Sequence, residues 1–295
     1  MKRASLTILA ALACLLASAQ QAEITVAQDG TGDFMTVQEA IDACPDYDHG
    51  HITTIFIKEG IYKEMVTIPH NKFRLHIQGA GADKTVITFD KYAEKKWPGT
   101  DRKIGTSGSA TMYIHSSYVT LEDLTVENSS GEGKEIGQGV FDLRKSRLGI
   151  LTITESTIKG GRDLVRADAS TITGAFSCTA NTIDGSNLGV NGNAIMYVRA
   201  TPESYVFKNN LFLNEKADGK SVLLSKTSGI TVPTLASGNY VWNYDETNFF
   251  SGLFTQEAAA MTVLSADPVK DSAGGDYTVT DAAVKAAGAG ASRWR

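Results

Sequence analysis

Cysteine and long apolar runs are scarce in this chain of 295 residues, which has 3 cysteines. Cys14 lies in a segment that we expect to be removed. Cys44 and Cys178 cannot supply a disulfide framework by themselves, so we expect both to be buried free thiols. No stretch is apolar over the roughly twenty residues that a membrane helix needs, so no membrane span is expected. No low-complexity tract indicates disorder, and one domain is the expectation.

Positive charge is also in short supply, because 28 Lys and Arg face 33 Asp and Glu, a formal net charge of −5. Loss of Lys2 and Arg3 with the expected leader changes the charge to −7. This balance argues against nucleic acid or an anionic membrane surface as a partner, and it favours a neutral or weakly charged substrate.

The first nineteen residues have the pattern of a secretory signal peptide. Lys2 and Arg3 precede an apolar run of about eleven residues that ends at Leu16, and small residues follow up to Ala19. A lipoprotein signal centred on Cys14 fits the preceding residues poorly. We therefore expect residues 1–19 to be cleaved near Ala19 and the protein to be secreted or periplasmic.

Short β-rich runs dominate the chain from Ile52 onward. They are rich in Val, Ile, Thr, Phe and Tyr and are bounded by Gly, Asn, Asp or Ser. The runs are ITTIFI, RLHIQG, TVITF, TMYIH, VTLEDLTVEN, ILTITESTI, AFSCTANTI, AIMYV and YVFKNNLFL. We therefore predict an all-β fold.

A longer period underlies these runs, because Asn or Ser recurs at positions 128, 156, 181, 210 and 239, in steps of 28, 25, 29 and 29. Such a period indicates a solenoid whose coils stack, with an internal ladder of amide side chains. We predict a single-stranded right-handed parallel β-helix over residues 20–245. A β-sandwich is the alternative, but strands every eight to twelve residues do not explain the longer period.

The two ends of the solenoid need covers. In FMTVQEAIDACPD the apolar residues share one helical face, Thr36 and Glu39 form a capping box, and Pro45 stops the helix. This predicts an N-terminal cap helix. From about residue 245 the β pattern loosens, so we expect residues 246–295 to form an irregular C-terminal cover of the same domain.

Metal, serine and dinucleotide chemistry find little support. The five histidines show no ligand spacing, so no metal site is expected. GTSGS at 105–109 fails as a nucleophile elbow because Ser109 stands where glycine is required. ITVAQDGTGDF is followed by Met35 at the third glycine position of a dinucleotide fingerprint, so no cofactor is expected. Carboxylate, amide and guanidinium chemistry remains, which points towards polysaccharides.

Six phrases between Ile24 and Leu143 follow one another in a characteristic order. They are ITVAQDGTGDFMTVQEAID, IFIKEGIYKEMVTIP, IQGAGADKTVITFD, GTSGSATMYI, VTLEDLTVENSSG and GQGVFDL. This order resembles that of pectin methylesterases (pectinesterases), and the Gly60-x-Tyr62-x-Glu64 and Gly-Gln138-x-Val phrases are the more specific. The resemblance implies a capped right-handed β-helix that hydrolyses methyl esters of pectin (homogalacturonan). The C-terminal half resembles uncharacterised β-helix proteins of bacterial polysaccharide-utilisation systems instead.

The resemblance also implies a mechanism with two aspartates. One attacks the ester carbonyl and the other is the general acid/base, while glutamine amides hold the oxyanion and an arginine fixes the nucleophile. Gln138 matches the first glutamine. By its distance from Gln138, Asp163 matches the acid/base, whereas by local pattern IKGGRDLV resembles the segment of the nucleophile. Both roles stay open.

The remaining family positions are incomplete. The family's Leu-Gly-Arg-Pro-Trp phrase is absent, so Arg162 or Arg166 would have to substitute, and Arg162 also replaces the second oxyanion glutamine. Asp168 is the candidate for the second carboxylate, although five residues of extended chain would put it roughly 16 Å from Asp163. Tyr113 and Trp97 are candidates for contacts with a sugar, and packing or loop anchoring is the alternative for each.

Three functions are compatible with this pattern. The first is a carbohydrate esterase that acts on pectin or a related plant polysaccharide as a monomer. The second is a non-catalytic β-helix that binds polysaccharide. The third is a pectate-type lyase, in which a basic residue abstracts a proton and Asp163 or Asp168 holds calcium.

Overall fold

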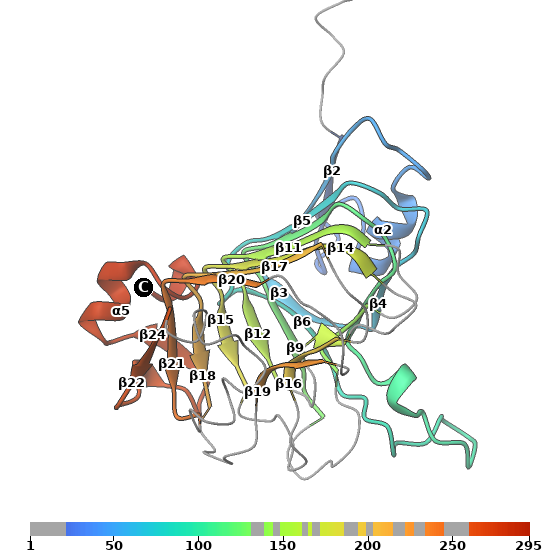
Figure 1. The fold of residues 1–295 in the computed structure, drawn as a ribbon. Coiled ribbons are helices and arrows are strands. Elements are labelled where there is room, and N and C mark those ends of the chain that lie inside the picture. Colours follow the sequence, from blue (N-terminus) through green and yellow to red (C-terminus); the bar gives the residue numbers. More distant parts are fainter. Residues whose placement is uncertain are drawn as a thin grey trace, which may run out of the picture.

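Three parallel sheets wind into a right-handed β-helix, described by a computed structural model over residues 22–130, 139–143, 148–160, 165–166, 172–185, 194–198, 203–214, 222–226, 234–244 and 260–295 (Figure 1). Between Thr53 and Lys226 each coil contributes one strand to sheet A, then one to sheet B, then one to sheet C. The predicted all-β parallel β-helix is therefore confirmed.

The strands of the three sheets are given in their order along the stack. Sheet A consists of β1 (Ala22–Val26), β2 (Thr53–Ile57), β5 (Leu75–Gly79), β8 (Val119–Glu122), β11 (Leu148–Thr154), β14 (Ile172–Thr179), β17 (Ser204–Lys208) and β20 (Thr234–Ser237). Sheet B consists of β3 (Gly60–Lys63), β6 (Thr85–Phe89), β9 (Thr125–Asn128), β12 (Thr157–Lys159), β15 (Thr182–Asp184), β18 (Leu211–Leu213), β21 (Asn239–Trp242) and β22 (Met261–Leu264). Sheet C consists of β4 (Val66–Ile68), β7 (Met112–Ile114), β10 (Phe141–Asp142), β13 (Val165–Arg166), β16 (Ala194–Val198) and β19 (Val222–Lys226).

The four longest β-rich runs of the sequence are each two strands with a sharp corner between sheets A and B. The corner residue has a positive φ in every case: 54° at Asp123, 49° at Glu155, 54° at Ala180 and 51° at Asn209. Residues with side chains rarely adopt this left-handed conformation, so the corners are not evident from β propensity.

The predicted amide ladder is present directly after these corners. The backbone N–H of Ser156 donates to Asn181 Oδ1 at 3.0 Å, that of Asn181 to Asn210 Oδ1 at 3.0 Å, and that of Asn210 to Asn239 Oδ1 at 2.9 Å. All four residues are buried. A ladder of this kind satisfies corner N–H groups that lie too deep for water to reach.

Position 128 was wrongly included in the ladder. The register Thr125↔Thr157 puts Leu124, not Asn128, level with Ser156. Asn128 lies at the end of β9, where its amide holds other segments, as described below. The sequence period failed here because Asn128 follows a β-rich run as the ladder residues do, but it stands at the end of a strand of sheet B and not at the corner between sheets A and B.

The core lies inside the coils, and the strands alternate buried and half-buried residues, as in β2 and β5. One continuous apolar cluster fills it from Val26 to Met261. Cys44 and Cys178 are buried free thiols, as expected. Burial raises the pKa of Cys44 to about 11 and that of Cys178 to about 12.

The predicted cap helix is α2 (Val37–Ala43), at the N-terminal end of the stack (Figure 1). Thr36 is its N-cap, and the Thr36 hydroxyl accepts from the Glu39 N–H at 3.2 Å. Two further N–H groups of the first turn, those of Val37 and Gln38, donate to the Glu64 carboxylate at 2.9 and 3.0 Å. Glu64 therefore belongs to the cap, and its negative charge suits a helix N-terminus.

Helix α2 also closes the first edge of sheet C. The Gln38 side chain donates to the Thr67 carbonyl at 3.0 Å and accepts from the Thr67 N–H at 2.7 Å. An edge strand with open backbone groups can pair with another chain. Gln38 occupies both groups of Thr67 in β4.

The described part of the expected C-terminal cover, residues 260–295, is more regular than predicted. After β22 it contains the antiparallel pair β23 (Val269–Asp271) and β24 (Asp276–Val279), then α5 (Ala282–Ala287) and η2 (Ser292–Trp294). Figure 1 shows α5 and α2 at opposite ends of the stack. A second apolar cluster joins this segment to Leu211 and Leu213 of sheet B.

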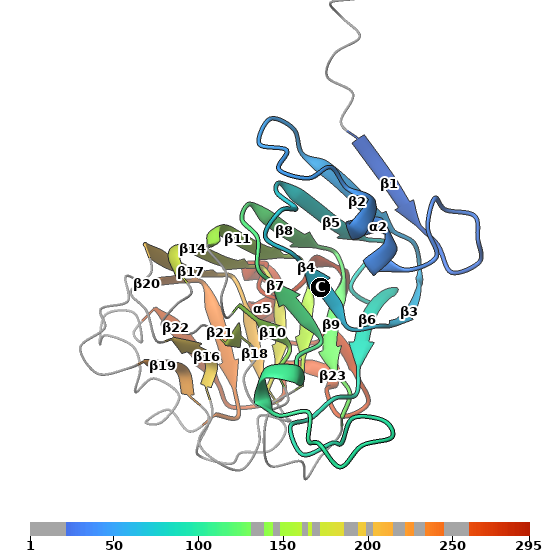
Figure 2. The ribbon, with the colours of Figure 1, turned by 90° about the vertical axis from the view of Figure 1, so that its right-hand side faces the viewer.

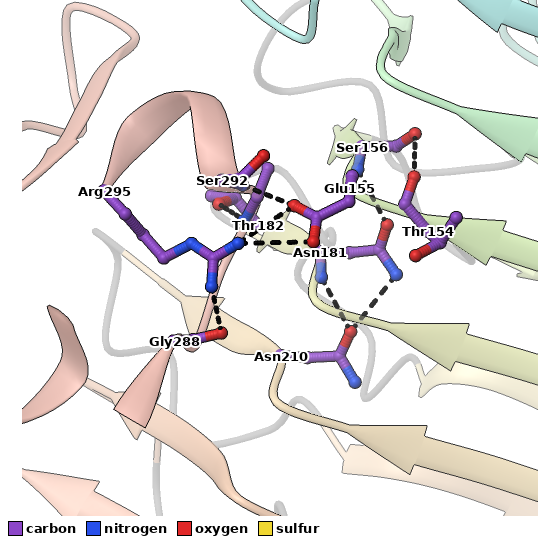
Figure 3. A network of polar contacts seen from close by, with 10 residues as sticks. Thr154, Glu155, Ser156, Asn181, Thr182, Asn210, Gly288, Ser292 and Arg295 are labelled. Atoms are coloured by element: carbon purple, nitrogen blue, oxygen red, sulfur yellow. Dashed lines mark hydrogen bonds and ion pairs between the residues drawn. The ribbon is translucent and has the colours of Figure 1, made fainter. Parts of the chain in front are cut away.

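Residues 289–295 then run back along the corner between sheets A and B. Gly290 N–H donates to the Asn209 carbonyl at 2.9 Å, and Trp294 Nε1 donates to Thr157 Oγ1 at 2.9 Å. Figure 3 shows Arg295 reaching Glu155, with Nη2 3.2 Å from both carboxylate oxygens. Within the described residues no helix is long and apolar enough to cross a membrane.

Candidate active site

Most residues proposed for the site from sequence lie outside the described residues. These are Gln138, Arg162, Asp163 and Asp168. The backbone of Arg166 is described, as part of β13, but its side chain is not. Tyr113 and Trp97 are described fully.

Sheet C brings together the two strands that follow Gln138 and Asp163 in the sequence. Gln138 stands three positions before Phe141, the first residue of β10, and Asp163 stands two positions before Val165, the first residue of β13. Phe141 and Val165 are register partners in adjacent parallel strands. The two candidate residues therefore precede, in the sequence, neighbouring strands of one sheet.

At one register position of sheet C, four adjacent strands carry a polar, charged or aromatic residue. Asp142 pairs with Tyr113 of β7 on one side and with Arg166 of β13 on the other. The fourth residue is Tyr197 of β16. Parallel strands lie about 4.8 Å apart, so Asp142 is next to a tyrosine and an arginine position.

Asp142 is the residue that sequence reasoning left out of the site. Phe141 beside it is in the core, and strand alternation puts Asp142 on the outer face of sheet C, where it is nevertheless only 4% exposed. Asp142 is engaged in polar interactions. A buried carboxylate is rare unless it is paired, which is the signal that could have found it, but burial is not visible in the sequence.

Tyr113 is held in place by contacts with two residues close to it in the sequence. It lies on the outer face of β7 and is half-buried, and its hydroxyl accepts from the Ala110 N–H at 3.1 Å. Its ring also meets His115 edge-on, with the centroids 6.3 Å apart. Tyr113 is thus a fixed aromatic wall next to Asp142.

Trp97 anchors the loop over residues 90–108, between β6 and β7. The backbone N–H of Trp97 donates to the Arg102 carbonyl at 3.0 Å. The Lys91 ammonium lies 4.5 Å from the centroid of the Trp97 ring. Burial lowers the pKa of Lys91. The loop ends at the 3₁₀ turn η1 (Thr106–Gly108). These contacts fit the loop-anchoring alternative, and a contact between Trp97 and a sugar stays a prediction.

Asn128 joins three segments around this site. Its Nδ2 donates to the carbonyls of Lys91 at 3.0 Å, Ser109 at 2.9 Å and Gly139 at 3.1 Å. Gly139 directly follows Gln138. Asn128 is only 3% exposed, so no water replaces these bonds readily, and its amide determines where the chain enters β10.

The specific family phrase around Tyr62 and Glu64 is structural. Tyr62 is 1% exposed, and its hydroxyl donates to the Lys58 carbonyl at 3.0 Å. Glu64 caps α2. In this structure Tyr62 therefore belongs to the packing of the first coil, and Glu64 to the N-terminal cap.

Comparison with known proteins gives a consistent result for the front of the chain. The family model for pectinesterase matches residues 23–163. Pectinesterase 4 of Arabidopsis thaliana is 39% identical over 106 residues, which are 36% of this chain and 17% of that protein. A pectinesterase/pectinesterase inhibitor of Brassica campestris is 40% identical over 106 residues, or 36% and 18% of the two chains. This chain thus matches less than a fifth of the length of either relative.

Solved structures resemble the chain over a larger part of its length. Pectin methylesterase PemA from Erwinia chrysanthemi aligns with a TM-score of 0.54 at 19% identity, covering 76% of this chain and 64% of that one. Pectin methylesterase from carrot aligns with a TM-score of 0.52 at 20% identity, covering 85% and 90%. At these identities the likeness is one of fold. Residues 23–163 therefore carry the sequence pattern of the pectinesterase family, on a right-handed parallel β-helix that continues beyond them.

Proposed function

We propose that this chain hydrolyses methyl esters of pectin, with Asp163 and Gln138 at the reacting ester. The observation that carries the proposal is the adjacency of β10 and β13, the strands that these two residues directly precede. A chain spans at most about 3.6 Å per residue, so Gln138 is within about 11 Å of Phe141, and Asp163 within about 7 Å of Val165, measured between Cα atoms.

Ester hydrolysis needs the two kinds of group that these positions supply. The carbonyl oxygen becomes negative when the carbonyl carbon is attacked, and an amide donor such as Gln138 stabilises that charge. A carboxyl such as Asp163 either attacks the carbonyl as a carboxylate or gives its proton to the departing methoxide. If Asp163 attacks, methoxide leaves with a proton as methanol, and water then hydrolyses the covalent acyl-aspartate; if Asp163 is the acid, another carboxylate or a water molecule attacks the carbonyl. In both roles one water is consumed, and the products are methanol and a free galacturonate carboxylate.

Asp142 and Arg166 extend this arrangement. They are register partners in adjacent strands of sheet C, which supports the proposal of an ion pair between neighbouring coils. Arg166 then takes the part of the arginine that fixes the nucleophile. Asp168 is less suited as the second carboxylate, because the extended strand β13 separates it from Asp163 in sequence.

The net charge of the chain and an aromatic residue on sheet C support methyl-esterified pectin as the substrate. A net charge of −5 disfavours binding to a densely anionic polymer, whereas methyl esterification removes the negative charges of pectin. Tyr113 offers an aromatic wall on sheet C. We further propose that the protein acts as a secreted or periplasmic monomer.

Methanol release from methyl-esterified pectin tests the proposal. We expect release by the wild-type protein and a loss of at least a hundredfold in Asp163→Asn, because removal of a reacting group or oxyanion donor costs on the order of 10² or more in rate. Asp142→Asn should lower the rate less. Asp184→Asn is the matched control, since Asp184 is also a buried aspartate, 1% exposed, but lies in sheet B.

The outcomes separate the three functions. Absence of methanol from folded wild-type protein would overturn the esterase proposal. Tight pectin binding without turnover would then favour the binding β-helix. Unsaturated products that absorb in the ultraviolet and depend on calcium would favour the lyase.

A further inference from the structure

A groove of about 340 Å³ lies on the outer face of sheet A, away from the candidate active site on sheet C. It crosses β5 and β8, which lie side by side in Figure 2. Cavities that bind small molecules start at about this size. The proposed reaction does not use this face, although the groove residues lie within the part of the chain that matches the pectinesterase family.

A column of four residues forms one wall of the groove. Ile52, Arg74 and Tyr118 each stand one position before a strand of sheet A, and Ile150 is level with Tyr118 in the next coil. Three of the four are unusually exposed for large apolar residues: Ile52 at 47%, Tyr118 at 45% and Ile150 at 41%. A run of exposed apolar side chains across consecutive coils is typical of a binding surface.

Arg74 lies within this column as a cation. Its guanidinium carbon is 5.0 Å from the centroid of the Tyr118 ring. Among the described residues, no carboxylate lies within ion-pair distance of Arg74. The ring holds the guanidinium at the groove, and the planar donor fork remains suited to a carboxylate.

The floor of the groove supplies hydrogen-bonding groups. His76 Nε2 lies 2.7 Å from Glu122 Oε2, and both side chains are about a quarter exposed, at 25% and 29%. Thr120 lies level with His76 in the neighbouring strand. The Glu122 carboxylate is thus engaged by the His76 ring within the groove.

We propose that this groove is a second, non-catalytic site that binds a galacturonate unit of de-esterified pectin. The Tyr118 ring packs against the sugar, Arg74 binds its carboxylate, and Thr120, His76 and Glu122 bind its hydroxyls. The choice of galacturonate rests on the proposed function, because ester hydrolysis produces that free carboxylate. The acidic protein would otherwise repel such a polymer, so a local cation is needed.

The groove and the candidate active site are connected by one short corner. Tyr113 in β7 and Tyr118 at the groove are five positions apart. A polymer long enough to contact both faces gains from the raised local concentration of the second contact, whereas a short oligosaccharide does not. The site would therefore hold the de-esterified part of a chain while a neighbouring part reacts.

Calorimetric titration with an oligosaccharide of three galacturonate units tests the proposal directly at pH 7. We expect saturable binding by the wild-type protein, and Arg74→Leu and Tyr118→Ala should each remove one binding site or weaken it at least tenfold. Arg74→Lys should retain part of the affinity, and the fully methyl-esterified oligosaccharide should bind this site at least tenfold more weakly. Circular dichroism and thermal melting establish that each variant is folded.

Matched controls are available on the same molecule. Lys208→Leu removes an exposed cation of sheet A outside the groove, and Tyr47→Ala removes a tyrosine that is 56% exposed. Both should bind like the wild-type protein. Unchanged affinity in Arg74→Leu, equal binding of the esterified oligosaccharide, or an equal loss in Lys208→Leu would each overturn the proposal.

The same variants separate this proposal from the catalytic one. Arg74→Leu should raise KM for long pectin and leave kcat, and turnover of short esters, unchanged. Methanol release without binding at the groove would overturn the proposed second site and leave the esterase proposal intact. Binding at the groove in a protein that releases no methanol would overturn the esterase proposal and leave the second site intact.

Discussion

At the scale of single residues, the amide ladder is the feature most sensitive to substitution. Asn210 is fully buried, accepts from the Asn181 N–H, and donates to the Cys178 carbonyl and to Asn239 Oδ1, each at 2.9 to 3.0 Å. Asn210→Leu leaves several of these groups without partners, and each buried unsatisfied group costs about 1–3 kcal/mol. We expect urea denaturation to give a loss of about 3 kcal/mol or more.

The neighbouring asparagine is the control for this experiment. Asn209 is exposed, and its φ of 51° suits glycine, so Asn209→Gly should change the stability little. A loss in Asn210→Leu no larger than that in Asn209→Gly would contradict the role of the ladder.

At Asp123 we expect a substitution to raise the stability, the opposite of the effect at Asn210. Burial raises the pKa of its carboxyl, and the neighbouring Glu122 and Glu155 raise it further. A raised folded-state pKa favours the protonated acid, so stability is lost as the pH rises through that pKa and the ionised group is unfavourable at pH 7. Asp123→Asn should therefore raise Tm at pH 7, and the gain should disappear below the ordinary carboxyl pKa, near 3.8. Asn also tolerates the φ of 54° at this corner.

Thermal melts at pH 7 and pH 3.5 measure this difference. Glu122→Gln serves as the comparison. Glu122 Oε2 lies 2.7 Å from His76 Nε2, so this substitution removes a favourable contact and should lower Tm. An equal rise in Tm at both pH values would rule out the electrostatic explanation.

At the scale of elements, β24 is held to sheet B by one short polar contact. The Tyr277 hydroxyl donates to Asp184 Oδ2 at 2.5 Å, and both residues are buried. Tyr277→Phe keeps the ring and removes the donor from a buried carboxylate, which should cost about 1.5–3 kcal/mol. Chemical denaturation measures it, and Tyr47→Phe, at an exposed ring, should cost almost nothing.

The loop over residues 90–108 and the entry to β10 depend together on Asn128. Asn128→Ala removes the donor to the carbonyls of Lys91, Ser109 and Gly139. Because a small displacement of reacting groups can cost a hundredfold in rate, we expect methanol release to fall at least tenfold, with most of the change in kcat. Asn243→Ala removes a similar bond, to the Asn214 carbonyl at 2.8 Å, at a later coil and should not affect the rate. A rate in Asn128→Ala equal to that of Asn243→Ala would count against this positioning role.

At the scale of the whole molecule, residues 289–295 act as a strap across several coils. They contact corners as far apart in sequence as Asp83 and Asn209. Deletion of residues 276–295 also uncovers the apolar outer face at Leu211 and Leu213. We expect the shortened chain to bind a hydrophobic dye and to aggregate, because large exposed apolar patches cause association.

Light scattering and dye fluorescence measure this outcome. Arg293→Ala is the mild control, since it removes only a half-exposed ion pair with Asp83 at 2.7 Å. A soluble, dye-free shortened chain would mean that the strap is dispensable.

The sequence by itself determined the class of fold, the ladder positions 156, 181, 210 and 239, the cap helix and the free thiols. These features depend on local propensity and on repetition, and both are properties of the order of residues. It also located Gln138 and Asp163 through a resemblance of phrases. Whether Asp163 acts as nucleophile or acid/base was not decided there.

Only the tertiary structure decided which residues of different coils meet. The corner at Asp123 displaced Asn128 from the ladder, the register of β10 and β13 put Asp142 beside Arg166, and the strap brought Arg295 to Glu155. The physical reason is that a corner with a positive φ, or a register shift of one residue, costs little locally and yet changes every contact between coils. Those contacts lie far apart in sequence, so local patterns do not contain them.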